Sequence, residues 1–395
     1  MSTDRAFHFV DSSHRLAFLP FAYIRPLAHL YIGMDMLAEK WQHFISEEFH
    51  YSTEPYLAKK YPSADSKNNV LINPLFVPTQ ALAEAVQQLN HGEGIVYQDN
   101  WIACCTDALV FPSDPQELNI TVWEEALIFL QDKTDLFLKN NAVLLEDFKR
   151  LTAGKKSQKI SSTNQVIAAE NIFLAPGAKV ECSVLNASDG PIYIGENAEV
   201  MEGSLIRGSF FLGDNAVVKM GAKIYGGTSI ATYSKVGGEL SNVNLFPYSN
   251  KGHDGFLGNA VIGSWCNIGA ATDASNLKNN YDKLRVWDYA TEGFKKTDLQ
   301  FCGLLMGDYS RCGIHSMFNT ATVIGINVNA FGAGFPRTFI PSFTYGGAQG
   351  MTTYQFAKAM TANNAMMKRR DLALEETDHT LLAEVFDLSS KWRKA

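Results

Sequence analysis

Aliphatic side chains recur at every sixth position through the middle of the chain. The residue four positions further on is small in six of the first seven repeats, and a glycine often follows the aliphatic residue directly. A fixed internal period of this kind is the sequence signature of a solenoid. The aliphatic positions are Ile194, Val200, Ile206, Leu212, Val218, Ile224, Ile230 and Val236.

Each six-residue unit predicts one short strand and one corner, and three units close a triangular coil. The aliphatic residues stack inside, where each stabilises the fold by about 1.5–3 kcal/mol when fully buried. The backbone pairs with the coils above and below, so the ends need caps. The pattern begins weakly near Leu174 and extends to Ala330. We therefore predict a left-handed parallel β-helix over residues 165–345, taking the handedness from the known behaviour of hexapeptide sequences.

The flanking segments predict different structures. Short apolar runs alternate with helical spacing over residues 1–151, which indicates an α/β domain. Residues 152–164 are polar and read as a linker, and residues 346–395 read as a C-terminal helical cap. The expected N-terminal elements are a strand at 7–10, helices at 27–44, 82–89 and 122–151, an apolar run at 69–72, and a hairpin from 94–96 and 101–104.

Composition narrows the class of protein. The chain has 395 residues and a net charge of -7, which fits two domains and argues against a broad nucleic-acid footprint. No apolar run is long enough for a membrane helix, and the N-terminus does not read as a signal peptide. The six cysteines form no metal-binding pattern. We expect buried thiols of a cytoplasmic protein.

Two insertions interrupt the repeats, at residues 241–255 and 270–300, and loops on a rigid scaffold commonly carry function. His253 stands in the first insertion between Gly252 and Gly255. Histidine has an ordinary pKa near 6.5, which suits a general base that deprotonates an amine. His253 is therefore the main catalytic candidate, and Asp254 either orients it or is simply solvated.

Other polar residues leave two interpretations open. Asn267 and Asn276 either stack in a side-chain ladder or hydrogen-bond a substrate. Lys219 is a solvated lysine unless a sugar phosphate binds there, and the same holds for Lys223. Arg25 is either a phosphate ligand or an ordinary surface arginine at a turn. His315 is expected at the surface or at an interface.

Several stretches resemble the bifunctional family that joins a sugar-1-phosphate uridylyltransferase to a glucosamine-1-phosphate N-acetyltransferase and so makes UDP-N-acetylglucosamine. The chain is most similar to the shorter form of that family, which has a divergent nucleotidyltransferase domain. The resemblance covers nearly the whole chain. Its motifs include FLPFAYIRPLAHLYIGMDMLAEKW, SNKGHDGFLGNAVIGSWCNIGA, NLKNNYDKLRVWDY and FGAGFPRTFIPSF.

The resemblance implies roles for particular residues. The catalytic histidine of the family falls on His253, and its acceptor-binding asparagines fall on Asn267 and Asn276. Its phosphate-binding arginine is replaced by Lys219, which keeps the charge without the bidentate fork. The remaining matches are Phe256 in place of an acceptor-binding tyrosine, Ser241 near the place of a lysine, and Ala333 at the CoA-site alanine.

The resemblance also implies ligands and partners. Acetyl-CoA would be the acyl donor, a sugar phosphate and a nucleoside triphosphate would be substrates, and the chain would form a homotrimer without nucleic acid or membrane partners. The basic segment Lys368-Arg369-Arg370 either caps the β-helix or binds CoA phosphates.

The N-terminal half departs from the family. Related nucleotidyltransferases open with a glycine-rich GxGTR loop, but the first glycine here is Gly33, and Arg25-Pro26 stands where a basic phosphate contact is expected. Mg²⁺ would need carboxylates, for which Asp11 and Asp99 are the candidates. Two hypotheses follow: a nucleotide-sugar transferase with an acyltransferase β-helix, or a catalytically degenerate trimeric scaffold that senses a ligand.

Overall fold

The computed structural model describes residues 5–64 and 66–393, which form two compact units. The first unit contains Ala22–Leu30, Asp35–Asp132 and the described residues before Leu19. The second contains Leu19–Phe21, Tyr31–Met34 and the chain from Lys133 onward. The unit boundary therefore falls before residue 151, so the segment 133–151 packs with the β-helix.

The first unit is built on a mixed six-stranded sheet in the order β4-β1-β5-β7-β6-β8. Strand β1 lies between β4 and β5 and is parallel to both, whereas β5, β7 and β6 are antiparallel neighbours. The predicted strand, the 82–89 helix and the hairpin are confirmed. The elements are β1 (Arg5–Val10), β4 (Phe49–Ser52), β5 (Asn68–Ile72), β6 (Glu93–Tyr97), β7 (Asn100–Thr106), β8 (Asn119–Val122), α1 (Leu37–Phe44), α2 (Gln80–Gln87), and the 3-10 turns η1 (Ser13–Phe18), η2 (Leu27–His29) and η3 (Pro115–Glu117).

Two helix predictions were too long. In the 27–44 segment the α-helix begins only at Leu37. Before it lie η2 and the short strands β2 (Tyr31–Ile32) and β3 (Asp35–Met36). Gly33 breaks the helix at φ +68°, where the next residue, Met34, donates its backbone N–H to Asp147 Oδ2 at 2.9 Å. Long-range pairing thus overrides the local spacing.

The 122–151 segment is helical only in α3 (Asp135–Leu138) and α4 (Asn140–Thr152). Before them the chain is irregular apart from an isolated bridge between Phe76 and Phe129. Leu130 donates its backbone N–H to Leu75 O at 2.9 Å, and Phe129 stacks on Phe76 at 4.3 Å. Apolar residues at helical spacing do not fix a helix, because the same side chains can instead pack against a distant segment, as Phe129 does against Phe76.

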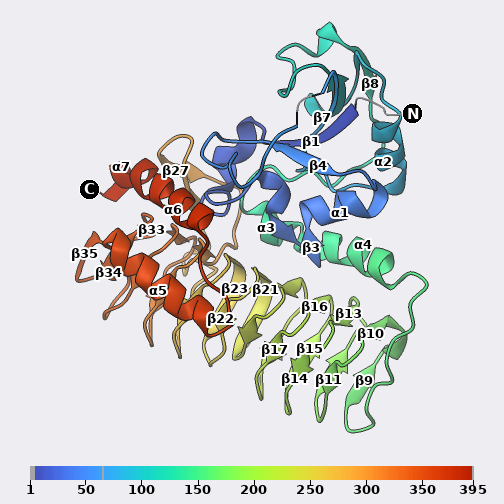
Figure 1. Ribbon diagram of the computed structural model, residues 1–395. Coiled ribbons are helices and arrows are strands. Elements are labelled where there is room, and N and C mark those ends of the chain that lie inside the picture. Colours follow the sequence, from blue (N-terminus) through green and yellow to red (C-terminus); the bar gives the residue numbers. More distant parts are fainter. Residues whose placement is uncertain (1–4, 65, 394–395) are drawn as a thin grey trace. The chain divides into compact units, whose positions relative to one another are not determined.

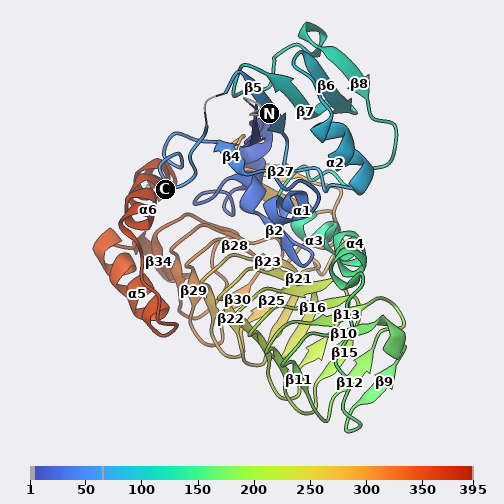
Figure 2. The ribbon, with the colours of Figure 1, turned by 45° about the vertical axis from the view of Figure 1, so that its right-hand side comes forward.

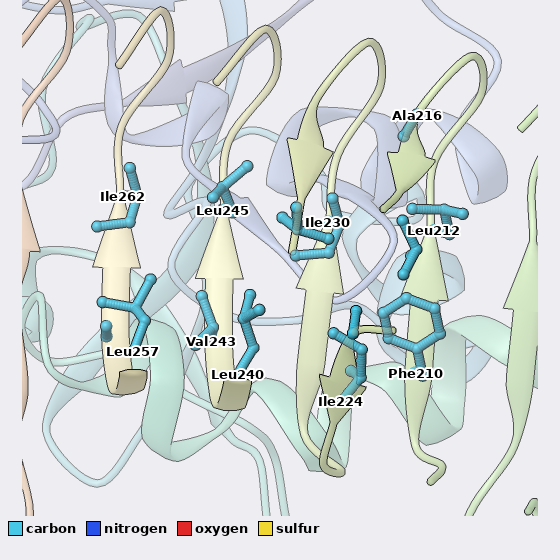
Figure 3. Close-up of a cluster of buried hydrophobic side chains, with 14 of the residues drawn as sticks. Phe210, Leu212, Ala216, Ile224, Ile230, Leu240, Val243, Leu245, Leu257 and Ile262 are labelled. Carbon is cyan, nitrogen blue, oxygen red and sulfur yellow. The ribbon is translucent and has the colours of Figure 1, made fainter. Parts of the chain in front are cut away.

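The second unit is the parallel β-helix, and the predicted architecture of α/β part, left-handed β-helix and C-terminal helices is confirmed. All eight ladder residues are at most 2% exposed. Figure 3 shows how residues such as Leu212, Ile230, Leu245 and Ile262 point into the prism from successive coils. The coils can be followed in Figure 1 from β9 to β33.

Parallel pairing joins each strand to the same side of the next coil. The strands of the largest sheet are β9 (Gln165–Ile167), β10 (Ile172–Leu174), β12 (Val184–Asn186), β13 (Ile192–Ile194), β15 (Leu205–Arg207), β16 (Phe210–Leu212), β18 (Lys223–Ile224), β19 (Thr228–Ile230), β21 (Glu239–Leu245), β23 (Phe256–Ile262), β25 (Asp273–Ala274), β28 (Leu305–Met306), β30 (Met317–Phe318), β31 (Val323–Ile324) and β33 (Phe339–Ile340). A second sheet contains β11 (Lys179–Val180), β14 (Glu199–Val200), β17 (Val217–Val218), β20 (Lys235–Val236), β22 (Asn250–Lys251), β24 (Asn267–Ile268), β29 (Arg311–Cys312), β32 (Asn329–Ala330), β34 (Thr344–Gly347) and β35 (Gly350–Thr353).

The predicted insertion 241–255 is mostly part of the coils. Strands β21 and β22 occupy much of it, so only Gly252–Gly255 leaves the ladder as a loop. The second insertion does leave the prism, as an antiparallel hairpin of β26 (Arg285–Asp288) and β27 (Gly293–Lys296). The N-terminal corner also holds the turn η4 (Ala169–Asn171).

Helices α3 and α4 lie along the large sheet, as both ribbon views show (Figures 1 and 2). Asn140 of α4 donates from Nδ2 to Gly227 O at 2.8 Å and to Ser229 Oγ at 3.0 Å. Asn244 in turn donates to Tyr31 O at 2.7 Å and to Leu136 O at 3.0 Å. These buried amides fix the helices to the coils, because an unpaired buried polar group would cost free energy.

The predicted helical cap 346–395 is helical only from Phe356, because β34 and β35 form an antiparallel hairpin before it. Its helices are α5 (Phe356–Lys368), α6 (Glu376–Leu388) and α7 (Ser390–Arg393). Asn363 anchors α5 by accepting from Arg311 Nη2 at 2.8 Å and donating to Asn327 Oδ1 at 2.7 Å. Five cysteines are buried as expected, and Cys182 is exposed. Within residues 5–64 and 66–393, no helix combines the length and the apolar character that crossing a bilayer requires.

Candidate functional site

His253 lies at the surface of the second sheet, in the loop Gly252–Gly255 between β22 and β23. The loop is held from below by Lys251, which is only 2% exposed. Lys251 Nζ donates to His253 O at 2.6 Å and to Gly237 O at 3.1 Å. The backbone of the histidine is thereby tied to the prism, while its side chain remains exposed to solvent.

Lys251 is a positioning residue that the sequence analysis missed. It pairs in register with Val236 and takes the place that an aliphatic ladder residue would occupy. Burial lowers the pKa of Lys251 to about 8, and the nearby Asp254 and Asp273 carboxylates act in the opposite direction. Lys251 is out of phase with the six-residue repeat counted from either Val236 or Ile262, so the repeat left no signal for it.

Gly255 closes the same loop with φ +117°, a backbone conformation that L-residues rarely adopt. A Cβ on Gly255 would lie 2.1 Å from Thr272 O, whereas a Cβ on Gly252 would meet nothing within 4 Å. We expect Gly255→Ala to destabilise the protein by about 1–3 kcal/mol and to displace the His253 loop. Thermal unfolding checks this, with Gly252→Ala as the matched control that should stay close to wild type; equal melting temperatures for both variants would contradict it.

His253 lines a cavity of about 740 Å³ that also brings Asn267 and Lys219 together. We call it the His253 cavity. One wall is the second sheet, where Asn267 pairs in register with Asn250 and Arg311. The opposite wall comes from the C-terminal end of α5. The other lining residues are Lys235, Tyr248, Gly252, Trp265, Ile268, Gly269, Ala270, Ile314, Ala365, Met366, Arg369 and Arg370.

The charged side chains that line the His253 cavity are all basic. Its lining contains five lysine or arginine side chains and no aspartate or glutamate, although the whole chain carries a net charge of -7. Burial lowers the pKa of Lys235, and the positive charges of Arg370, Lys219 and Arg369 lower it further. Such a cluster of cations is suited to phosphate groups.

An aromatic stack forms part of the same wall. Tyr233 and Tyr248 stack with ring centroids 5.1 Å apart, and Tyr248 stacks on Trp265 at 4.3 Å. Arg370 donates from Nη2 to Tyr233 O at 3.0 Å, which fixes the end of α5 beside the stack. The cavity therefore combines an imidazole, an amide, cations and flat rings.

Phe256 and Asn276 lie together elsewhere on the prism and do not line the His253 cavity. A Cβ on Gly258 would contact the Phe256 ring at 2.6 Å and Asn276 Nδ2 at 2.9 Å, so both flank Gly258. Ser241 pairs in register with Gly258 and belongs to the same group. Asn276 donates to Asn259 Oδ1 at 2.7 Å. The residues carried over from the family resemblance thus form two groups within one chain.

The remaining candidates of the second unit are solvent-facing. Ala333 is exposed in the loop after β32, and His315 and Lys223 are exposed on the coils. None of the three is among the residues that line the His253 cavity.

The first unit has its own cavity of about 470 Å³, lined by Asp11, Thr53, Asn73 and Asp99 among others. Asp11, Thr53 and Asn73 each follow a strand of the parallel set β1, β4 and β5. The chain passes from β1 to β4 on one side and then to β5 on the other. The cavity therefore lies at the carboxyl ends of strands where the order reverses, which is where open α/β sheets bind ligands. Arg25 is half-buried and is not among the lining residues.

Mg²⁺ does not fit the candidate carboxylate Asp11. Its Oδ1 accepts from Leu27 N at 2.7 Å, and its Oδ2 accepts from Arg15 Nη1 at 2.6 Å and from Thr53. Asp99 is exposed at the cavity rim. Within the described part of the chain, no three His, Cys, Asp or Glu side chains are grouped so as to hold a metal ion. Asp11 acts as a structural acceptor that ties Arg15 and η2 to the sheet.

Comparisons with known proteins match the N-terminal part to one family model and find two solved structures of low similarity. Residues 7–156 match a family model described as sugar nucleotidyl transferase. No curated protein matches the chain. A UDP-N-acetylglucosamine acyltransferase structure from Arabidopsis is 14% identical over 60% of this chain and 82% of its own, with a TM-score of 0.24. One from Campylobacter jejuni is 12% identical over 59% and 83%, with a TM-score of 0.19.

Proposed function

We propose that the β-helix transfers an acetyl group from acetyl-CoA to the amine of a hexosamine phosphate. The observation that carries this proposal is the His253 cavity, in which His253 and Asn267 face a space ringed by five cationic side chains and no acidic ones. Those cations fit the phosphates of CoA and of a sugar phosphate, because Arg and Lys are the residues that bind such groups. CoA would supply the acetyl group as a thioester.

His253 would act as the general base. Its imidazole takes the proton from the acceptor amine as the nitrogen forms its bond to the acetyl carbon, and returns that proton to the departing sulfur. Asn267 would orient the acceptor through its side-chain amide. Lys251 keeps the imidazole in place by binding the His253 carbonyl. Lys235, Arg369 and Arg370 would hold phosphate oxygens at the end of the cavity that α5 forms.

A homotrimer would complete this site. Phe256, Asn276 and Ser241 form the second group of family-matched residues, around Gly258 rather than in the His253 cavity. In a symmetric trimer, the group of one subunit would face the His253 cavity of the next. The five buried thiols suit the reducing cytoplasm, where we place the protein.

We further propose that the first unit binds a sugar phosphate and a nucleoside triphosphate as a sugar nucleotidyltransferase of the UDP-N-acetylglucosamine type. Two observations favour this second activity: the family match over residues 7–156, and the cavity at the point where the order of the parallel strands reverses. The occupied oxygens of Asp11 speak against a metal at that residue.

Two assays on the purified full chain test both activities. The first follows release of CoA thiol from acetyl-CoA in the presence of glucosamine-1-phosphate. The second follows pyrophosphate release from UTP with N-acetylglucosamine-1-phosphate. We expect turnover in the first assay that depends on the amine, with glucose-1-phosphate as the inactive matched acceptor. Silence in both assays across several sugar phosphates would instead support the degenerate scaffold.

A further inference from the structure

A separate cavity of about 670 Å³ lies in the second unit between the β26–β27 hairpin, the last coils and α7. It shares no lining residue with the His253 cavity. We call it the aromatic cavity, because five of its lining residues carry flat rings. These are Trp287, Phe294, Phe335, Phe339 and Trp392.

The aromatic cavity is built on a stacked pair. Trp287 of the hairpin lies on Phe339 of β33 with ring centroids 3.9 Å apart and planes 8° from parallel. Phe294 meets Trp287 edge-on at 5.4 Å. In contrast to this packed pair, Phe335 is 52% exposed and Phe294 is 37% exposed. Two rings of the lining are thus left with free surface on which a planar group can stack.

Cations accompany the rings, and no acidic residue lines the cavity. Arg337 is exposed and forms no ion pair with any residue that the structure describes. Lys391 lies over the Trp392 ring at 4.6 Å and pairs with Glu292 of the hairpin turn. Arg393 also lines the cavity, but it is bound to Ser342 O and Phe386 O. Arg337 is therefore the cation placed to meet an anion, because Lys391 is already paired with Glu292.

The walls also hold polar hydrogens without an acceptor. Among the described residues, the indole Nε1 atoms of Trp287 and Trp392 are buried and have no hydrogen-bond partner. Trp287 as a whole is 9% exposed. A buried donor without a partner costs free energy.

We propose that the aromatic cavity is a binding site for a nucleoside phosphate. A base stacks on Phe335 or Phe294, as bases do on exposed aromatic side chains. Its phosphate meets Arg337, whose planar guanidinium binds phosphate in a bidentate manner. An aliphatic chain would fill the apolar walls but leave Arg337 without an anion. This site is independent of the acetyl-transfer proposal, since it shares no residue with the His253 cavity.

Calorimetric titration of the full chain with ADP and with UDP tests the site. At least one should bind, and adenosine or uridine, which lack phosphate, should bind more weakly. Arg337→Glu should weaken binding by tenfold or more, on the order expected for losing a charge-assisted contact and adding a repulsive charge. Phe335→Ala should weaken it by roughly tenfold through lost stacking. Both side chains are exposed, so neither change should prevent folding, which a melting curve confirms.

Two matched variants separate this site from others. Arg207→Glu reverses the charge of an exposed arginine on a distant coil. It should leave the affinity for ADP and UDP unchanged. The double variant Lys235→Ser and Arg369→Ser disables the His253 cavity and should retain binding at the aromatic cavity. The proposal is overturned if Arg337→Glu binds both diphosphates as wild type does, or if the double variant abolishes all binding. Loss of acetyl transfer in the double variant with intact diphosphate binding would support both proposals separately.

Discussion

Alanine in place of His253 is expected to lower kcat for acetylation of glucosamine-1-phosphate by about 10²–10⁴-fold, the usual contribution of a positioned general base. His253 is the only histidine in the lining of its cavity, and that lining offers no carboxylate to take over the proton. In the proposed mechanism the lysine and arginine side chains of the lining would bind phosphate and would not take the proton from the reacting amine. KM for acetyl-CoA should change little, because those cations remain in place.

Release of CoA thiol under saturating substrates measures this effect. His91→Ala is the matched control, since His91 is an exposed histidine at a turn of the first unit. It should keep the wild-type rate. A His253→Ala enzyme that turns over at the wild-type rate, with an unchanged melting temperature, would remove the residue from the mechanism. A lower rate accompanied by a lower melting temperature would point to loss of the loop instead, and Gly255→Ala provides the reference for that case.

The β-helix could be predicted because its register is local. Each coil repeats the same choice of inward aliphatic and small corner residue, and a ladder residue such as Ile224 pairs in register with Ile206 and Leu240 of the adjacent coils. The first unit lacks this repetition. Its segment 123–134 is irregular rather than helical, and Phe129 stacks there on Phe76, a partner far away in the sequence. Helical spacing alone cannot weigh such a contact.

The candidate site likewise contains some residues that the sequence indicates and others that only the structure brings together. His253 could be found because glycines on both sides mark a loop that leaves the repeat. Lys219 and Asn267 were named from the sequence and line the same cavity. Arg369 was named only within the basic segment 368–370, with two interpretations left open, and Arg311 was not named, because it lies on another coil far from His253 along the chain. Charges that converge from distant segments leave no pattern along the chain, and Lys251 left none either, because it is out of phase with the six-residue repeat.

Acid is expected to destabilise the first unit through His8. This residue is 0% exposed in β1, the central strand of the parallel set, and its ring lies 5.5 Å from that of His50 on β4. Burial lowers the pKa of His8 to about 4; the His50 charge lowers it further, and Asn69 acts in the opposite direction. In the unfolded chain the pKa returns to about 6.5.

The sign of the effect follows from proton binding. Above pH 6.5 neither state protonates His8, so the group makes no pH-dependent contribution. Between pH 6.5 and about 4 the unfolded chain takes up a proton that the folded unit does not, and stability is lost progressively as the pH falls. The full loss is about 3 kcal/mol, because each pH unit between the two pKa values is worth about 1.4 kcal/mol. Below pH 4 both states bind the proton, and the loss grows no further.

Urea unfolding at pH 7, 5.5 and 4, followed by tryptophan fluorescence, measures this loss, and His8→Phe isolates it. The variant keeps a flat ring in the packed position but cannot take up a proton. Its free energy of unfolding should therefore decrease less than that of wild type as the pH is lowered from 7 to 4. His29 shares the low pKa of about 4 and contributes equally to both proteins, so it cancels in the comparison. His91→Phe, at an exposed site, should follow the wild-type curve. The difference in the free energy of unfolding between wild type and His8→Phe should therefore change between pH 7 and pH 4. Only a group that changes charge in one protein and not in the other can make that difference depend on pH. If the difference were the same at both pH values, the buried imidazole would not be the source of the acid sensitivity.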